Sequence, residues 1–73
     1  MRRLDLRGEV CPYTFVKSKL TMEQMAAGEE LCVTVDYEPS SRNVPKSMKL
    51  MGEEVVSVEA KPDGTWEIIL KKA

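Results

Sequence analysis

Two thiols are the residues most able to do chemistry in this sequence, Cys11 and Cys32, and there is no histidine. Cys11 stands in the stretch RGEVCPYTFV, directly before Pro12 and at the expected start of a helix. The unpaired N–H groups and positive dipole end of a helix favour an anion and lower the pKa of a thiol placed there. Because cysteine is not a preferred capping residue, Cys11 is a candidate nucleophile that could attack or accept sulfur. The alternative interpretation is a small, half-buried apolar residue at a strand-to-helix turn.

The residues around Cys11 fall into two groups. A supporting motif is expected to shape the turn and the helix start: Gly8, Glu9, Pro12 and Thr14. A second group could tune the thiolate or help a partner to dock: Arg7, Tyr13 and Lys17. Glycine permits a tight turn, and proline is tolerated at the first helical position because its missing N–H would have no partner there.

Cys32 lies in the middle of an expected strand, where no helix terminus lowers its pKa, and it is interpreted as a small residue on a sheet face. The expected topology places it well beyond the roughly 7 Å Cα separation that a disulfide to Cys11 would need. With two thiols and no histidine, neither a structural zinc site nor Cys–His catalysis is expected. No metal is therefore predicted, and no organic cofactor is predicted either, because sulfur exchange needs only an accessible sulfur and a suitable thiolate.

Hydrophobic patterning predicts six elements in the order βαβαββ. They are strand 3–7, a helix from 12 to about 26, strand 30–36, a short helix opening at Pro45 and ending before Gly52, and strands 55–61 and 65–71. The first two strands are joined through a helix and should be parallel, and the turn Pro62-Asp63-Gly64 should pair the last two antiparallel. The predicted fold class is α/β (α+β), a two-layer sandwich with a four-stranded mixed sheet and two helices on one face.

Alternation along the strands predicts which side chains face the helices. The inward set is Leu31, Val33, Val35, Val56, Val58, Trp66, Ile68 and Leu70. The outward set is Cys32, Thr34, Val55, Ser57, Glu59, Glu67 and Ile69. In the first helix the apolar positions are Phe15, Val16, Leu20 and Met25, with Met22 beside them.

Length and charge limit the classes of protein. The 73 residues predict a single domain, 1–73, and a net charge of −1 argues against direct binding to nucleic acid or to a membrane surface. The sequence has neither the roughly 20-residue apolar run of a membrane span nor the apolar core of a signal peptide, so a cytoplasmic protein is expected.

The following segments, in this order, resemble the TusA-like (SirA-like) sulfurtransferase family across nearly the whole chain: LDLRGEVCP, the spacing to MAAGEELCVTVD, NVP and the G-E-x-V entry to the third strand. The resemblance implies the same two-layer fold and a small cytosolic sulfur carrier. In that family the cysteine of a Cys-Pro-x-Pro motif accepts a persulfide sulfur and passes it on, and Cys11 and Pro12 match its first two residues. Thr14 replaces the second proline, and Glu53 stands where a histidine is often found.

The resemblance also implies partners. They are a sulfur-donor protein, of the cysteine desulfurase or rhodanese type, and a sulfur-acceptor protein in a route such as tRNA thiolation, cofactor assembly, or sulfur or selenium metabolism. A persulfide carrier is favoured over a true multiple-turnover enzyme. A noncatalytic regulatory or protein-interaction module, using the basic helices or the open sheet face, is the alternative.

Overall fold

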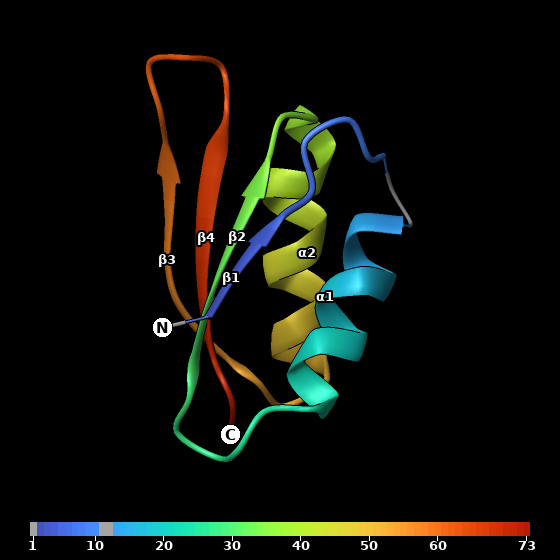
Figure 1. Cartoon of the computed structure of the whole chain (residues 1–73), viewed down its shortest axis with the longest axis vertical. Helices are drawn as coiled ribbons and strands as arrows, with labels where there is room; N and C mark the ends of the chain where they lie inside the picture. Colours follow the sequence, from blue (N-terminus) through green and yellow to red (C-terminus); the bar gives the residue numbers. More distant parts are fainter. Residues whose placement is uncertain (1, 11–12) are drawn as a thin grey trace.

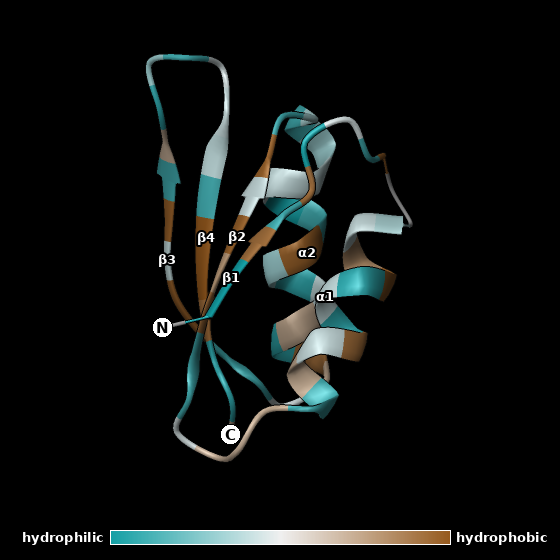
Figure 2. Ribbon diagram, viewed as in Figure 1, coloured by the Kyte–Doolittle hydropathy of each residue, from teal (hydrophilic) through white to brown (hydrophobic). Residues whose placement is uncertain are grey.

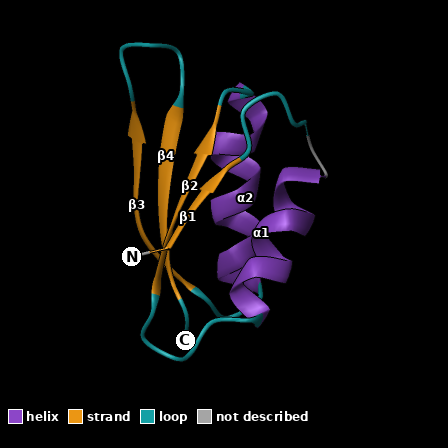
Figure 3. Ribbon diagram, viewed as in Figure 1, coloured by secondary structure: helices purple, strands orange, loops and turns teal. Residues whose placement is uncertain are grey.

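The computed structural model describes residues 2–10 and 13–73. Its elements are β1 (Arg2–Asp5), α1 (Tyr13–Glu23), β2 (Glu30–Val35), α2 (Glu38–Leu50), β3 (Glu54–Ala60) and β4 (Trp66–Lys71). The two helices lie side by side on one face of the sheet, and the other face is open (Figures 1 and 3). The predicted βαβαββ order and two-layer sandwich are confirmed.

The sheet has the strand order β1-β2-β4-β3. β1 and β2 are parallel, whereas β4 is antiparallel to both β2 and β3. Parallel pairing brings the carboxyl ends of β1 and β2 to the same end of the sheet, from which the chain continues into α1 and α2. Residues 6–10, which follow β1, therefore leave the sheet beside the start of α2.

The core lies between the helices and the inner face of the sheet. Alternate residues of β2 and β4 line it as predicted: Leu31, Val33, Val35, Ile68 and Leu70 are all fully buried, and Trp66 packs against them. Val44 and Met48 of α2 and Met22 of α1 close the core from the helix side. No helix among the described residues is long and apolar enough to cross a membrane.

β3 departs from the predicted alternation near its N-terminal end. Val55 pairs with Leu70 and Ser57 with Ile69, so Val56 is an extra residue in a β-bulge. An extra residue reverses the faces of a strand, and Val55 therefore packs against the core while Val56 is exposed. The prediction was wrong for these two valines. Val58 lies opposite the inward-facing Ile68 as expected but stays exposed at the sheet edge.

α2 begins seven residues earlier than predicted, at Glu38, and Pro45 lies inside it. Pro39 occupies the first turn, where a missing N–H costs nothing, and Glu38 forms an ion pair with Arg42 one turn later at 2.8 Å. Pro45 removes one helical hydrogen bond, but burial of Val44 and Met48 on either side of it holds the helix against the sheet.

α1 presents a different face to the core than the apolar spacing predicted. Its fully buried positions are Thr14, Ser18 and Met22, whereas Val16 and Leu20 are exposed. Small inward side chains let α1 lie close to α2. Hydrophobic colour consequently appears on the side of α1 that is turned away from α2 and the sheet (Figure 2). The helix also ends at Glu23, and Met25 is buried in the turn that follows.

Candidate functional site

The candidate site is the segment that joins β1 to α1. Its first half is fastened to the end of β2: the Leu6 N–H donates to the Thr34 carbonyl at 2.8 Å, and the Gly8 N–H donates to Asp36 Oδ1 at 2.9 Å. The Glu9 N–H closes the turn by donating to the Leu6 carbonyl at 3.1 Å. Gly8 has a φ of +87°, a backbone conformation that favours glycine.

Cys11 and Pro12 lie outside the described residues, and so do the predicted cap and first helical position. The residues on either side of the pair are joined directly. The N–H groups of Tyr13 and Thr14 both donate to the Val10 carbonyl, at 2.9 and 3.4 Å. Val10 is thus held at the N-terminal end of α1, where N–H groups and the helix dipole favour an anion.

The two basic residues expected to tune the thiolate are each paired with a carboxylate. The Arg7 guanidinium holds both oxygens of Asp5, at 3.0 and 2.8 Å, which lowers the pKa of Asp5 and raises that of Arg7. Lys17 Nζ lies 3.1 Å from Glu9 Oε1. Because these charges are neutralised locally, they add little net positive potential to the segment.

Thr14 is fully buried, and its hydroxyl is hydrogen-bonded to that of Ser40 on α2 at 3.0 Å. The Ser18 hydroxyl donates to the Thr14 carbonyl one turn further on, at 2.7 Å. Thr14 was expected to support the helix start in place of the second motif proline, and its side chain also links the two helices. Tyr13, next to it, is exposed.

Cys32 lies on the face of the sheet opposite the helices, as predicted, since its neighbours Leu31 and Val33 point into the core. Although on the open face, its side chain is only 2% exposed, between Arg3 of β1 and Ile69 of β4. Burial and the nearby Glu67 carboxylate raise the pKa of this thiol, against the smaller opposing effects of Arg3 and Lys61. Cys32 is therefore a protonated, covered thiol at neutral pH.

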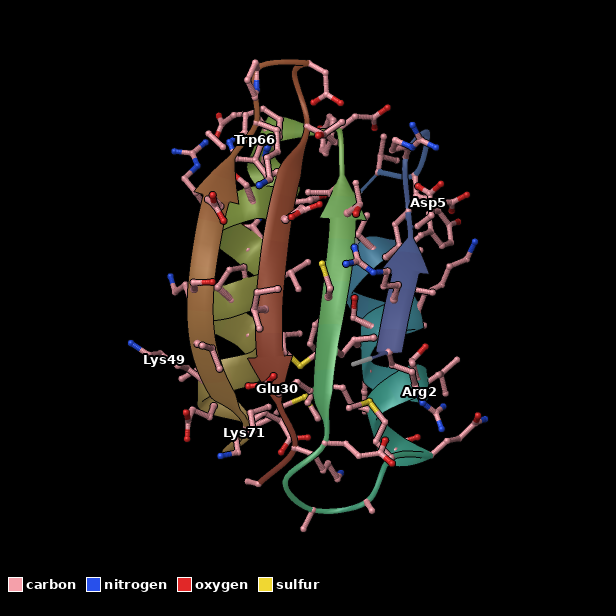
Figure 4. The ribbon with its side chains drawn as sticks, turned by 60° about the vertical axis from the view of Figure 1, so that its left-hand side comes forward. Arg2, Asp5, Glu30, Lys49, Trp66 and Lys71 are labelled. Atoms are coloured by element: carbon pink, nitrogen blue, oxygen red, sulfur yellow. The ribbon has the colours of Figure 1, made fainter. Side chains whose placement is uncertain are left out.

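Figure 4 looks onto the open face of the sheet, with the helices behind it and Asp5 labelled on β1. This face carries a hollow of about 660 Å³, lined by Arg3, Leu4, Asp5, Arg7, Thr34, Lys61, Pro62, Asp63, Thr65 and Glu67. Its positive and negative side chains are equal in number and largely form ion pairs. Arg7 pairs with Asp5, and Lys61 pairs with Glu67 at 3.4 Å. Across the described parts of the chain, residues 2–10 and 13–73, no cluster of three metal-ligating side chains is found.

Sequence reasoning missed Asp36 and Ser40 as parts of the site. Asp36 directly follows β2, and the carboxyl ends of parallel strands lie side by side, so its place beside Gly8 could have been read from the topology. Ser40 had no such signal, because the segment around it was interpreted as a loop.

The fold and the site define a class of small α+β proteins with a thiol just ahead of the first helix. A sequence model of the family "Sulfurtransferase TusA" matches residues 2–72, and the chain belongs to that family. The resemblance inferred from the sequence segments is thereby confirmed.

Named relatives agree with this. A "Putative sulfur carrier protein" of Archaeoglobus fulgidus is 51% identical over 69 residues, covering 94% of this chain and 78% of the relative. A protein of the same name from Thermotoga maritima is 39% identical over 70 residues, covering 96% and 89%. The crystal structure of a SirA-like protein from Desulfitobacterium hafniense superposes with a TM-score of 0.86 at 29% identity, covering 97% of this chain and 96% of that one.

Proposed function

We propose that this protein carries sulfur as a persulfide on Cys11 and relays it from a donor protein to an acceptor protein. The observation that carries the proposal is the state of the other thiol. The chain has two cysteines, and Cys32 is buried with a raised pKa. In a family of sulfurtransferases, Cys11 is then the thiol left to hold the transferred atom.

The chemistry needs no cofactor on this chain. The Cys11 thiolate attacks the outer sulfur of a donor persulfide, R–S–SH; the new bond joins Cys11 to that sulfur, the bond within the donor breaks, and the donor leaves as a thiolate. The proton stays on the outer sulfur, and no net oxidation occurs. An acceptor thiolate then attacks the same sulfur and regenerates the Cys11 thiolate.

The surroundings support a thiol activated by position. With no histidine in the chain, and with Arg7 and Lys17 engaged by Asp5 and Glu9, the helix N-terminus is the main local source of positive potential. Pro12 would fix the helix start, and Gly8 would allow the turn that Asp36 fastens. Tyr13 is exposed beside the site and is available to a docking partner.

The family resemblance supports a more detailed proposal for the partners and the compartment. The donor would be of the cysteine desulfurase or rhodanese type, and transfer would take place in the cytoplasm. The acceptor would belong to a route such as tRNA thiolation, cofactor assembly, or sulfur or selenium metabolism.

Intact-protein mass spectrometry tests the assignment to Cys11. After incubation with a cysteine desulfurase and L-cysteine, the wild type and Cys32→Ser should each gain the mass of one sulfur atom, which a reductant then removes. Cys11→Ser should gain none. Sulfur on Cys11→Ser would refute the proposal.

A further inference from the structure

The outward face of α1 is apolar, and no other described element covers it. Tyr13, Val16 and Leu20 recur at the spacing of one helix face, and Val10 continues the row, because its carbonyl accepts the Tyr13 N–H one turn earlier. The exposed fractions of these four side chains lie between 43% and 60%. We call Val10, Tyr13, Val16 and Leu20 the α1 stripe.

The packing of α1 makes this exposure unusual. Toward the core the helix turns Thr14 and Ser18, whose side chains are small and polar, together with Met22 and the partly buried Phe15, while Val16 and Leu20 stay exposed. Scattered exposed apolar residues are ordinary, but four of them at the spacing of one helix face indicate a surface that another molecule covers.

We propose that the α1 stripe is the docking surface for the protein that donates sulfur to Cys11, and that the donor meets it with an apolar surface. The inference rests on the proposed function. Sulfur transfer brings two sulfur atoms into bonding contact, so a donor must cover Val10 and Tyr13, which flank Cys11 and Pro12 in the chain. Leu20 follows about 10 Å further along the helix axis, within reach of the same partner.

Charge indicates an apolar donor surface rather than an acidic one. Lys17 and Lys19 stand on either side of the α1 stripe around the helix, and Glu9 neutralises Lys17 at 3.1 Å. The helix ends in the exposed acidic residue Glu23. An apolar centre with a polar, nearly neutral edge is the usual composition of a protein interface.

The test compares loading by proteins with loading by a small molecule. A double variant, Val16→Gln with Leu20→Gln, is loaded by a cysteine desulfurase with L-cysteine and by a rhodanese with thiosulfate, both from the same organism. Its KM should rise at least about tenfold with the donor that loads the wild type, as truncation of central interface residues does. Loading by inorganic polysulfide should not change.

Leu50→Gln is the matched control. Leu50 is 81% exposed at the last residue of α2, outside the α1 stripe, and this variant should keep the wild-type KM. Salt provides a second measurement: if the donor surface is apolar, KM should change by less than about threefold between roughly 0.05 and 0.5 M NaCl, where contacts between opposite charges would weaken steeply.

Each failure points to a different error. Three outcomes would overturn the docking proposal without affecting the proposed thiol chemistry. They are an unchanged KM in the double variant, a steep salt dependence of KM, and a wild type that is loaded by polysulfide but by neither donor protein. A wild-type dimer that the double variant dissociates would assign the α1 stripe to a second copy and also overturn it. If instead no reagent loads Cys11, the proposed function fails.

Discussion

The hydroxyl oxygens of Thr14 and Ser40 lie 3.0 Å apart and join α1 to α2 in a part of the molecule from which water is excluded. Thr14 occupies the place of the second proline in the Cys-Pro-x-Pro motif that the family resemblance implies. A proline has no hydroxyl and could not make this bond. In this chain, therefore, a hydrogen bond between helices takes the place of a rigid ring.

Thr14→Val and Ser40→Ala should each lower the free energy of unfolding by about 1–3 kcal/mol, because each leaves a buried hydroxyl with one hydrogen bond fewer. In urea denaturation, the double variant should lose less free energy of unfolding than the sum of the losses in the two single variants. Ser41→Ala is the control: the Ser41 hydroxyl donates to the Glu38 carbonyl within α2, so its effect should simply add to that of Thr14→Val. Additive costs for Thr14 and Ser40 would contradict the pairing.

Gly8→Ala and Gly64→Ala should destabilise the fold equally, by about 1–2 kcal/mol, since each forces alanine into a left-handed backbone. Their φ angles are +87° and +85°, and an added methyl group would meet no atom within 4 Å at either position. Only Gly8→Ala should slow persulfide loading, because Gly8 lies in the segment that Asp36 fastens ahead of Cys11. Equal loading rates of the two variants would show that the turn at Gly8 is not needed for persulfide loading.

Cys32 should resist alkylation in the folded protein. Iodoacetamide should add one group to the native wild type, on Cys11, and two after denaturation, counted by mass spectrometry. Native Cys11→Ala should therefore take up almost none. Because the pKa of Cys32 is raised, the little labelling it shows should increase only above the ordinary pH range of a thiol. Rapid labelling of Cys32 at neutral pH would be inconsistent with its burial.

The Asp5–Arg7 pair should contribute to stability only above the acid range. Arg7 lowers the pKa of Asp5 below its ordinary value of 3.8, so the unfolded chain binds more protons as the pH falls. The contribution is present above that ordinary value and is lost as the pH falls through the lowered one. In Arg7→Gln, NMR titration of the Asp5 carboxyl should show its pKa moving upward; an unchanged titration would rule out the pairing in solution.

The sheet could be predicted because its signals are local. β2 and β4 alternate strictly, and a Pro-Asp-Gly turn joins the last two strands, so their facing and pairing were correct. The bulge at Val56 has no comparable signal, since either register of β3 places valines inward. Where α2 begins was also ambiguous, because Pro39 and Pro45 both suit a first turn and burial of Ser40 against α1 decides between them.

The site was predictable in part. Cys11 and its neighbours are contiguous, and a thiol before a helix is a local pattern. The groups that fasten this segment lie far away in sequence: Asp36 is 28 residues from Gly8, and Ser40 is 26 from Thr14. The orientation of α1 could not be read from spacing, because apolar side chains stand on both of its faces and close approach to α2 selects the smaller ones.

The two faces of α1 are under different structural constraints. Thr14, Ser18 and Met22 hold the helix in the fold, whereas Val16 and Leu20 contribute little to it because they remain exposed. Substitutions on the outward face therefore leave the scaffold and the thiol intact. The proposed docking role would then allow partner preference to change during divergence through substitutions along a single helix.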